Sequence, residues 1–242
     1  MKYLSHGHPG AMFVHPAAAH AAVTNGTTKT GSFNWSGYAT TSTTQQAYSR
    51  VSGKWVTPKI SCPSKEDMLT SEWVGIDGFN TGTVEQDGSL DWCFRGKATY
   101  FTWYEMYPAG TIEVGRSLRP GDHITAVVSR SGTSYTLKVT DSKHHGSSFT
   151  KHSSCAAATC LDESAEWIAE RPEFSIGMAP LGDFHSWTLT SGTQTRSGKY
   201  GKISEAGNDK IEMIDATDSY DLATTSSLSG GNKFKVSWHN SW

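Results

Sequence analysis

The sequence predicts an all-β fold built from short antiparallel strands. Apolar and polar residues alternate over short runs, Gly, Ser and Thr separate the runs, and the chain holds nine each of Trp, Tyr and Phe. Alternation with a period of two places one face of a strand in a core, and aromatic and β-branched residues favour strands. A chain of 242 residues with 36% hydrophobic residues can bury one large core, so we expect a single β domain.

The strand-like runs follow one another through the whole body of the chain. The clearest hairpin surrounds the turn at Ser131 and Gly132, because three apolar residues alternate before it and three after it (Ile124, Ala126 and Val128, then Tyr135, Leu137 and Val139). Similar runs cover residues 48–56, 99–107, 211–214 and 233–238. No repeat or linker divides the chain after Phe33.

One run is ambiguous between helix and strand. Residues 162–171 contain Glu and Ala, which favour a helix, and Pro172 would end a helix one residue earlier. As a strand, the same run places Glu166, Ile168 and Glu170 on one face and Trp167 on the other. Local propensity does not decide between the two.

Residues 1–32 differ in composition from the rest. They contain His6, His8, His15 and His20 but no continuous apolar core of the kind found in a signal peptide. We expect a leader remnant or linker, or alternatively a prosegment remnant whose histidines gain charge as the pH falls through about 6 to 7. The main domain is expected to occupy residues 33–242.

The cysteines indicate an oxidising compartment. Four cysteines allow three pairings and have no metal-binding CxxC spacing. Closeness in the chain favours Cys155 with Cys160, which leaves Cys62 with Cys93; four buried free thiols are the alternative. Disulfides would place the protein outside the cell.

Charge and hydropathy exclude several partners. The net charge is −2 and the isoelectric point is near 6.5, so no basic footprint for nucleic acid or anionic lipid is expected. No apolar run approaches the roughly 20 residues that span a bilayer. We expect neither nucleic acid nor membrane partners.

Three segments resemble the glutamic peptidases of family G1, the eqolisins. They are Trp-Val-Gly-Ile-Asp-Gly at 73–78, Trp-Tyr-Glu-Met-Tyr-Pro at 103–108 and Ala-Glu-Trp-Ile-Ala-Glu at 165–170, with Gln86 and Gly88 between the first two. The chain departs from the fungal members in the cysteine pattern, in Met106, and in a glutamine one residue nearer to Trp73. That shift leaves Asp87 as a rival to Gln86, and the composition suggests a bacterial branch.

The resemblance implies a fold and an activity. The fold is an antiparallel two-sheet β-sandwich of the concanavalin A-like or jelly-roll type, with residues 165–170 as a strand. The activity is that of a secreted acid endopeptidase, insensitive to pepstatin, acting on polypeptides as a monomer without metal or cofactor. Gln86 and Glu170 take the catalytic positions, and the substrate-binding positions are Trp73, Asp77, Glu105 and Tyr107.

The pair suits direct attack of water on a peptide bond. Glu170 would take a proton from water and pass it to the leaving amine, while the amide of Gln86 donates to the oxyanion. An amide does not titrate in acid, whereas a second carboxyl group would. For Glu170 to act as a base in acid, we expect its pKa to lie near or below the ordinary value of about 4.3.

Other classes lack their motifs or remain as alternatives. The chain has no paired Asp-Thr/Ser-Gly triads, no His-Glu-x-x-His and no Gly-x-Ser-x-Gly, and His144-His145 is expected in a loop. The open alternatives are a glycosidase that uses Glu105 and Glu170, and a noncatalytic sugar-binding module. The separation of the two carboxyl groups would test the glycosidase.

Overall fold

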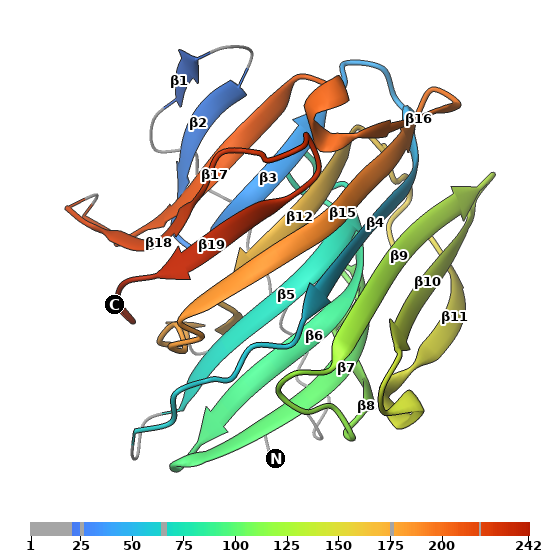
Figure 1. Cartoon of the computed structure of the whole chain (residues 1–242). Coiled ribbons are helices and arrows are strands. Elements are labelled where there is room, and N and C mark those ends of the chain that lie inside the picture. Colours follow the sequence, from blue (N-terminus) through green and yellow to red (C-terminus); the bar gives the residue numbers. More distant parts are fainter. Residues whose placement is uncertain (1–20, 25–26, 64–66, 175–176, 218) are drawn as a thin grey trace.

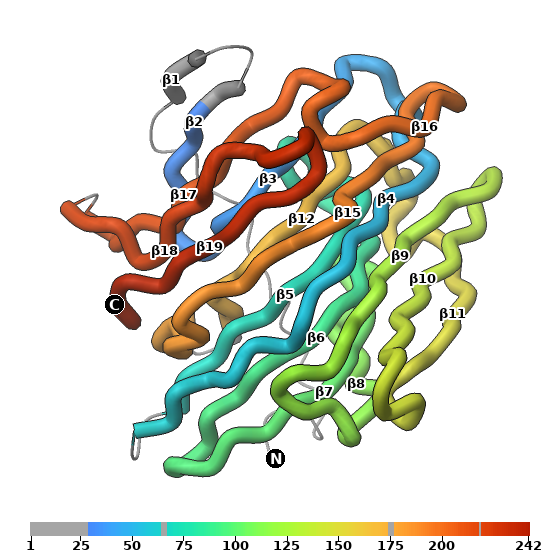
Figure 2. Tube along the Cα trace, viewed as in Figure 1, coloured from blue at the N-terminus to red at the C-terminus, as the bar shows by residue number. Residues whose placement is uncertain are grey.

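The structure is a computed structural model that describes residues 21–24, 27–63, 67–174, 177–217 and 219–242 (Figure 2). It is all-β, as predicted (Figure 1). No α-helix occurs within those ranges, and the helical elements are two short 3₁₀ turns, His145–Ser147 and Ile203–Glu205. The strands are β1 Ala21–Thr24, β2 Thr27–Ser32, β3 Trp35–Thr41, β4 Tyr48–Val56, β5 Met68–Ile76, β6 Val84–Phe94, β7 Lys97–Tyr107, β8 Ile112–Gly115, β9 His123–Ser131, β10 Ser134–Asp141, β11 Phe149–Ser154, β12 Ser164–Glu170, β13 Glu173–Phe174, β14 Gly177–Met178, β15 Ser186–Arg196, β16 Lys199–Lys202, β17 Asn208–Ile214, β18 Asp221–Thr225 and β19 Phe234–Trp238.

Two strand ladders face each other in a sandwich-like arrangement. The first runs in the order β2-β17-β3-β12-β5-β6-β7-β8, and the second runs β16-β15-β4-β9-β10-β11. β18 and β19 connect them at one end, because β18 pairs with β17 and β19 pairs with β15. Every described pairing in these ladders is antiparallel except β2 with β17. β4, β9 and β10 of the second ladder pack on β5 and β6 of the first.

Apolar residues fill both faces of the first ladder. The face toward the second ladder holds the larger cluster, which includes Val74, Trp167, Val128 and Leu137. The opposite face holds a second cluster that is rich in tryptophan (Trp35, Trp73, Trp92 and Trp103). We call this second face the tryptophan face. Its strands are buried on both sides, which is why β12 and β5 have no exposed residue.

The predicted hairpin and the strand over 165–170 are confirmed. β9 pairs with β10 in a register that sets Val128 opposite Leu137 and Ala126 opposite Val139. β12 lies between β3 and β5, and pairing on both sides gives its backbone partners that override the helix propensity of Glu and Ala.

Both predicted disulfides are present. Cys62–Cys93 ties the segment after β4 to the end of β6, and Cys155–Cys160 closes a short loop before β12. The described residues contain no free cysteine.

Part of the N-terminal segment, residues 1–32, forms strands. Residues 27–32 form β2 and pair in parallel with β17, and β1 pairs with β2. His6, His8, His15 and His20 lie outside the described residues. No helix in the described residues is long and apolar enough to cross a membrane.

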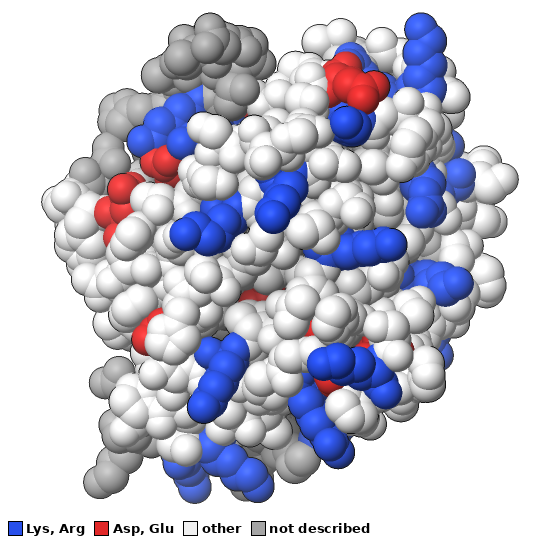
Figure 3. Space-filling view, in the orientation of Figure 1, with Lys and Arg blue, Asp and Glu red and all other residues white. Residues whose placement is uncertain are grey.

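Basic groups are more frequent than acidic groups on the surface that Figure 3 presents, most of which is uncharged. Figure 3 shows Lys and Arg side chains spread singly over the face it presents, with few Asp or Glu among them. The reason is that more than half of the 23 acidic residues are buried: Glu72, Asp77, Glu85, Asp87, Asp91, Glu105, Asp122, Asp141, Asp162, Glu166, Glu170, Glu212 and Asp215. Such burial favours the neutral acid and raises the pKa of a carboxyl group unless hydrogen bonds or cations offset it.

Candidate active site

Glu170 is held at the end of β12 on the tryptophan face. Its register partners are Ser71 on β5 and Trp35 on β3, and its side chain is fully buried. The indole Nε1 of Trp73 donates to Oε2 at 2.7 Å, and Nδ2 of Asn34 donates to Oε1 at 3.2 Å. Both carboxylate oxygens therefore accept a hydrogen bond from a neutral donor.

Burial changes the acidity of this carboxyl group. Desolvation raises the pKa of Glu170 well above its ordinary value, the N–H groups of Trp35, Trp73 and Asn34 lower it, and the charge of Glu105 raises it. The sequence had predicted a pKa near or below the ordinary value. The difference arises because full burial disfavours the charged form more than the neutral donors favour it.

Gln86 and Glu105 face each other across β6 and β7. They are register partners, and Nε2 of Gln86 donates to Oε2 of Glu105 at 2.6 Å. Thr111 donates to Oε1 of Glu105 at 2.8 Å. Burial raises the pKa of Glu105 to about 8, although both hydrogen bonds lower it. At acid pH the carboxyl group beside Gln86 is therefore neutral.

Two glycines make room for these side chains. Gly75 lies opposite Gln86, and a Cβ there would lie 2.9 Å from the Trp73 ring and 3.3 Å from Cβ of Gln86. Gly88 lies opposite Trp73, and a Cβ there would lie 2.1 Å from the carbonyl oxygen of Glu72. Any larger residue at either position would force the strands or the indole to move.

The strand alternation separates Gln86 from its rival Asp87. Gln86 shares the tryptophan face with Trp73, whereas Asp87 pairs with Val74 and points toward the core between the ladders. Burial raises the pKa of Asp87 well above its ordinary value. Asp87 therefore lies on the other side of the sheet from Glu170.

Asp77 lies beyond the end of β5 and fixes a loop. Its carboxylate accepts the backbone N–H groups of Asp162 at 2.7 Å and Glu163 at 2.8 Å, and Thr83 donates to it at 3.3 Å. This loop leads directly into β12. The predicted residue Asp77 thus holds the strand that carries Glu170, and its described bonds are not to Gln86 or Glu170.

The remaining predicted residue, Tyr107, ends β7 on the same face as Glu105 and is partly exposed. The structure adds three residues to which no role was assigned from the sequence. Asn34 and Thr111 hold the two carboxyl groups, and Glu166 is a buried carboxyl group opposite Gly75, in the same cross-strand row as Gln86. The run Asn-Trp-Ser-Gly at 34–37, which is similar to the opening of the family's domain, is a signal that could have found Asn34.

Three groups of described residues have the spacing of metal ligands, and none includes Gln86 or Glu170. In one, Nδ1 of His144 lies 2.7 Å from Asp122, close to Asp141. Both carboxylates there also accept backbone N–H groups of nearby loops, so their positions are explained by the loops. The other two share Glu85 and combine it with Asp77 and Asp162 or with the Cys155–Cys160 bridge.

Comparison with known proteins adds independent information. The model of the peptidase A4 family matches residues 33–238. Among solved structures, scytalidoglutamic peptidase with a transition state analog inhibitor is similar, with a TM-score of 0.72 and 24% identity over 85% of this chain and 98% of that chain. SCP-B, an eqolisin bound to the tripeptide Ala-Ile-His, has a TM-score of 0.66 and 21% identity over 85% and 98%. Aspergilloglutamic peptidase from Aspergillus niger has a TM-score of 0.62 and 26% identity over 71% and 99%. No curated protein sequence matches the chain significantly.

Proposed function

Because the chain belongs to the peptidase A4 family, the family of the glutamic peptidases, we propose that it is an acid endopeptidase in which Glu170 and Gln86 catalyse the attack of water on a peptide bond. The observation that carries this proposal is the pair of donors on Glu170. A buried carboxylate whose two oxygens accept N–H groups from Trp73 and Asn34 is oriented on the same face as the Gln86 amide. These hydrogen bonds are those expected of a positioned base, and Glu170 pairs with Ser71, four residues along β5 from Gly75, the partner of Gln86.

The reaction divides between the two side chains. The ionised fraction of Glu170, which burial reduces in acid, takes a proton from water as the water oxygen bonds to the carbonyl carbon, and the oxyanion forms. Protonated Glu170 then gives the proton to the amine as the C–N bond breaks. One hydrogen of the Gln86 amide is held by Glu105 at 2.6 Å, which leaves the other hydrogen of Nε2 to donate to the oxyanion.

Glu105 is proposed to position Gln86. Burial raises its pKa to about 8, so in acid it is neutral and adds no negative charge where the oxyanion develops. A neutral group at this position favours the transition state, because a charged one would repel the oxyanion. Trp73 and Tyr107 would contact the substrate, and Asp77 would act through the loop it holds.

The roles are tested by two matched substitutions on β12. Glu170→Gln should reduce kcat/KM on a denatured protein substrate by more than a thousandfold, while Glu166→Gln should reduce it less than tenfold. Both residues are fully buried on the same strand face, so circular dichroism and melting temperature should change alike. The reverse order of activities would assign the base to Glu166 and contradict the proposal.

The carbohydrate-active alternative is less well supported. Glu105 already bonds to Gln86 and Thr111, and the family match is to peptidases. A retaining or inverting glycosidase would require both Glu105 and Glu170 to reach the sugar.

Several finer expectations accompany the proposal. We propose a secreted monomer, in keeping with two disulfides, a pepstatin-insensitive enzyme without metal or cofactor, and the two-sheet jelly-roll topology. Residues 1–32 are proposed to be a leader or linker, or alternatively a prosegment. A chain that begins at Phe33 and matures with an unchanged pH dependence would contradict the prosegment role.

A further inference from the structure

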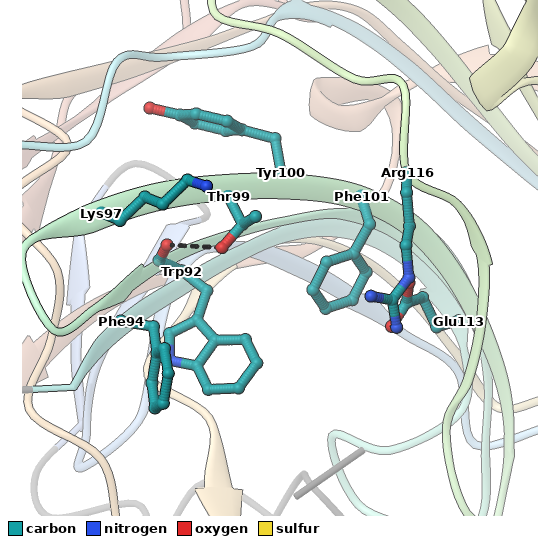
Figure 4. A pocket seen from close by; sticks show the side chains of 8 residues that line it. All are labelled: Trp92, Phe94, Lys97, Thr99, Tyr100, Phe101, Glu113 and Arg116. Atoms are coloured by element: carbon teal, nitrogen blue, oxygen red, sulfur yellow. Dashed lines mark hydrogen bonds and ion pairs between the residues drawn. The ribbon is translucent and has the colours of Figure 1, made fainter. Parts of the chain in front are cut away.

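A second feature of the tryptophan face lies toward the ends of β6 and β7, on the far side of Leu90 from Gln86. A cavity of about 350 Å³ is lined by the ends of β6 and β7 and by the residues after Ile112, and it is mainly apolar (Trp92, Phe94, Lys97, Thr99, Tyr100, Phe101, Glu113 and Arg116). Figure 4 shows the rings of Trp92, Phe94 and Phe101 on one side of the strands, whereas Tyr100 projects to the other. Pockets that bind small molecules or side chains begin at about this volume.

The register connects this cavity with the catalytic pair. On β6 the residues that face this way are Gln86, Gly88, Leu90, Trp92 and Phe94, and their partners on β7 include Glu105 and Thr99. Six residues of strand separate Gln86 from Trp92, which is about 20 Å at the usual rise of about 3.4 Å. An extended peptide of about six residues spans the same distance.

The lining favours one kind of occupant. Trp92 and Phe94 contact each other with ring centroids 5.2 Å apart, and Phe101 adds a third ring. Nε1 of Trp92 is buried without a hydrogen-bond partner in the described part of the chain, so it can donate to a carbonyl oxygen of an occupant. At the edge Arg116 pairs with Glu113, Nη2 donating to Oε2 at 2.8 Å, so the remaining charge of the lining is that of Lys97.

We propose that this cavity, the Trp92 pocket, is a distal substrate subsite that binds a large apolar side chain about six residues from the scissile bond. The occupant is a tryptophan, phenylalanine or leucine of an extended polypeptide lying along β6 and β7. Burial of this side chain against three rings would favour substrates that are long enough to reach both the pocket and the catalytic pair. This inference rests on the proposed peptidase function for its substrate, while the pocket itself can be tested by binding.

The test fills the pocket with a larger side chain and removes no buried side chain from the core. Thr99 lines the pocket and is exposed on β7, so Thr99→Phe should fill it with little strain. Thr150→Phe is the matched control, because Thr150 is an exposed strand threonine on β11. Each protein digests a denatured protein mixture at acid pH, and the residues around every cleaved bond are identified by mass spectrometry.

Wild type and Thr150→Phe should show large apolar residues enriched about tenfold at one position five to seven residues from the cleaved bond. Thr99→Phe should lose that enrichment and keep the preferences next to the bond. Equal profiles in all three proteins would overturn the proposal.

A binding measurement separates the pocket from the activity. N-acetyl-tryptophanamide is titrated into each protein by calorimetry, with N-acetyl-serinamide as the reference. Binding of the tryptophan compound to wild type and Thr150→Phe but not to Thr99→Phe supports the pocket even if no protein substrate is cleaved, in which case the peptidase proposal alone fails. Equal binding, or none, in all three proteins overturns the pocket.

Discussion

Replacing Trp73 by Phe removes one N–H group from the carboxylate of Glu170 and keeps a ring in place. The bond lost is 2.7 Å long and buried. A hydrogen bond from a neutral donor to a charged acceptor contributes about 1.5 to 3 kcal/mol, and one pKa unit corresponds to about 1.4 kcal/mol. Because the bond favours the ionised form, its loss should raise the pKa of Glu170 by a further 1 to 2 units.

The expected consequence appears in the pH dependence of catalysis. A base must be ionised, so kcat/KM rises with pH through the pKa of Glu170 and burial moves this rise toward higher pH. In Trp73→Phe the rise should move up by about 1 to 2 pH units, which lowers kcat/KM about 10- to 100-fold on the acid side. The assay is kcat/KM on a fluorogenic peptide between pH 2 and 8.

A matched substitution controls for lost packing. Trp167 is also fully buried, and its Nε1 donates to the backbone oxygen of Ser52 at 2.9 Å on the opposite face of the sheet. Trp167→Phe should reduce the free energy of unfolding by about 1 kcal/mol and should not change the pH at which kcat/KM rises. If kcat/KM rises at the same pH in Trp73→Phe as in wild type, or if the rise moves equally in both variants, the reasoning is refuted.

Three further outcomes are expected. Gln86→Glu should lower kcat/KM about 100- to 1000-fold with an unchanged circular dichroism spectrum, and retained turnover would argue against an oxyanion role. Burial raises the pKa of Glu72 in the core between the ladders, so its contribution to stability is fully present below the ordinary pKa of about 4.3 and is lost as the pH rises through its folded-state pKa. The free energy of unfolding in urea should therefore fall less between pH 4 and pH 7.5 in Glu72→Gln than in wild type. An equal fall in both proteins would be inconsistent with this account. Removing the Cys62–Cys93 bridge, which closes a loop of 31 residues, should reduce the free energy of unfolding by about 3 to 4 kcal/mol. Removing Cys155–Cys160, which closes 5 residues, should reduce it by about 2 kcal/mol. The opposite order in denaturant unfolding would count against loop closure as the cause.

The fold could be predicted to the level of its strands. The hairpin of β9 and β10 was visible because its apolar residues alternate and a glycine turn separates them. The strand at 164–170 could not be settled by local propensity, because what decides it is pairing with β3 and β5, which are distant in the chain. Its assignment depended on the family resemblance.

The sequence named candidate site residues, whose roles stay a prediction, but it did not give their electrostatics. The motifs identified Glu170, Gln86 and Glu105, and the structure places Gln86 against Glu105 and Trp73 against Glu170. The raised pKa of Glu170 could not be read from the sequence, because it depends on complete burial. Carboxyl groups such as Asp87 resemble surface residues in the sequence, yet they lie in the core between the ladders.

The central claim is that Glu170 catalyses peptide hydrolysis without a metal or a catalytic aspartate pair. The most direct test measures hydrolysis of a denatured protein between pH 2 and 7 by wild type and by Glu170→Ala, each with pepstatin and with a chelator. The account predicts acid-side hydrolysis that resists both inhibitors and is absent from the folded variant. Hydrolysis that persists in Glu170→Ala, or none by the wild-type protein at any pH once the N-terminal segment is removed, would contradict it.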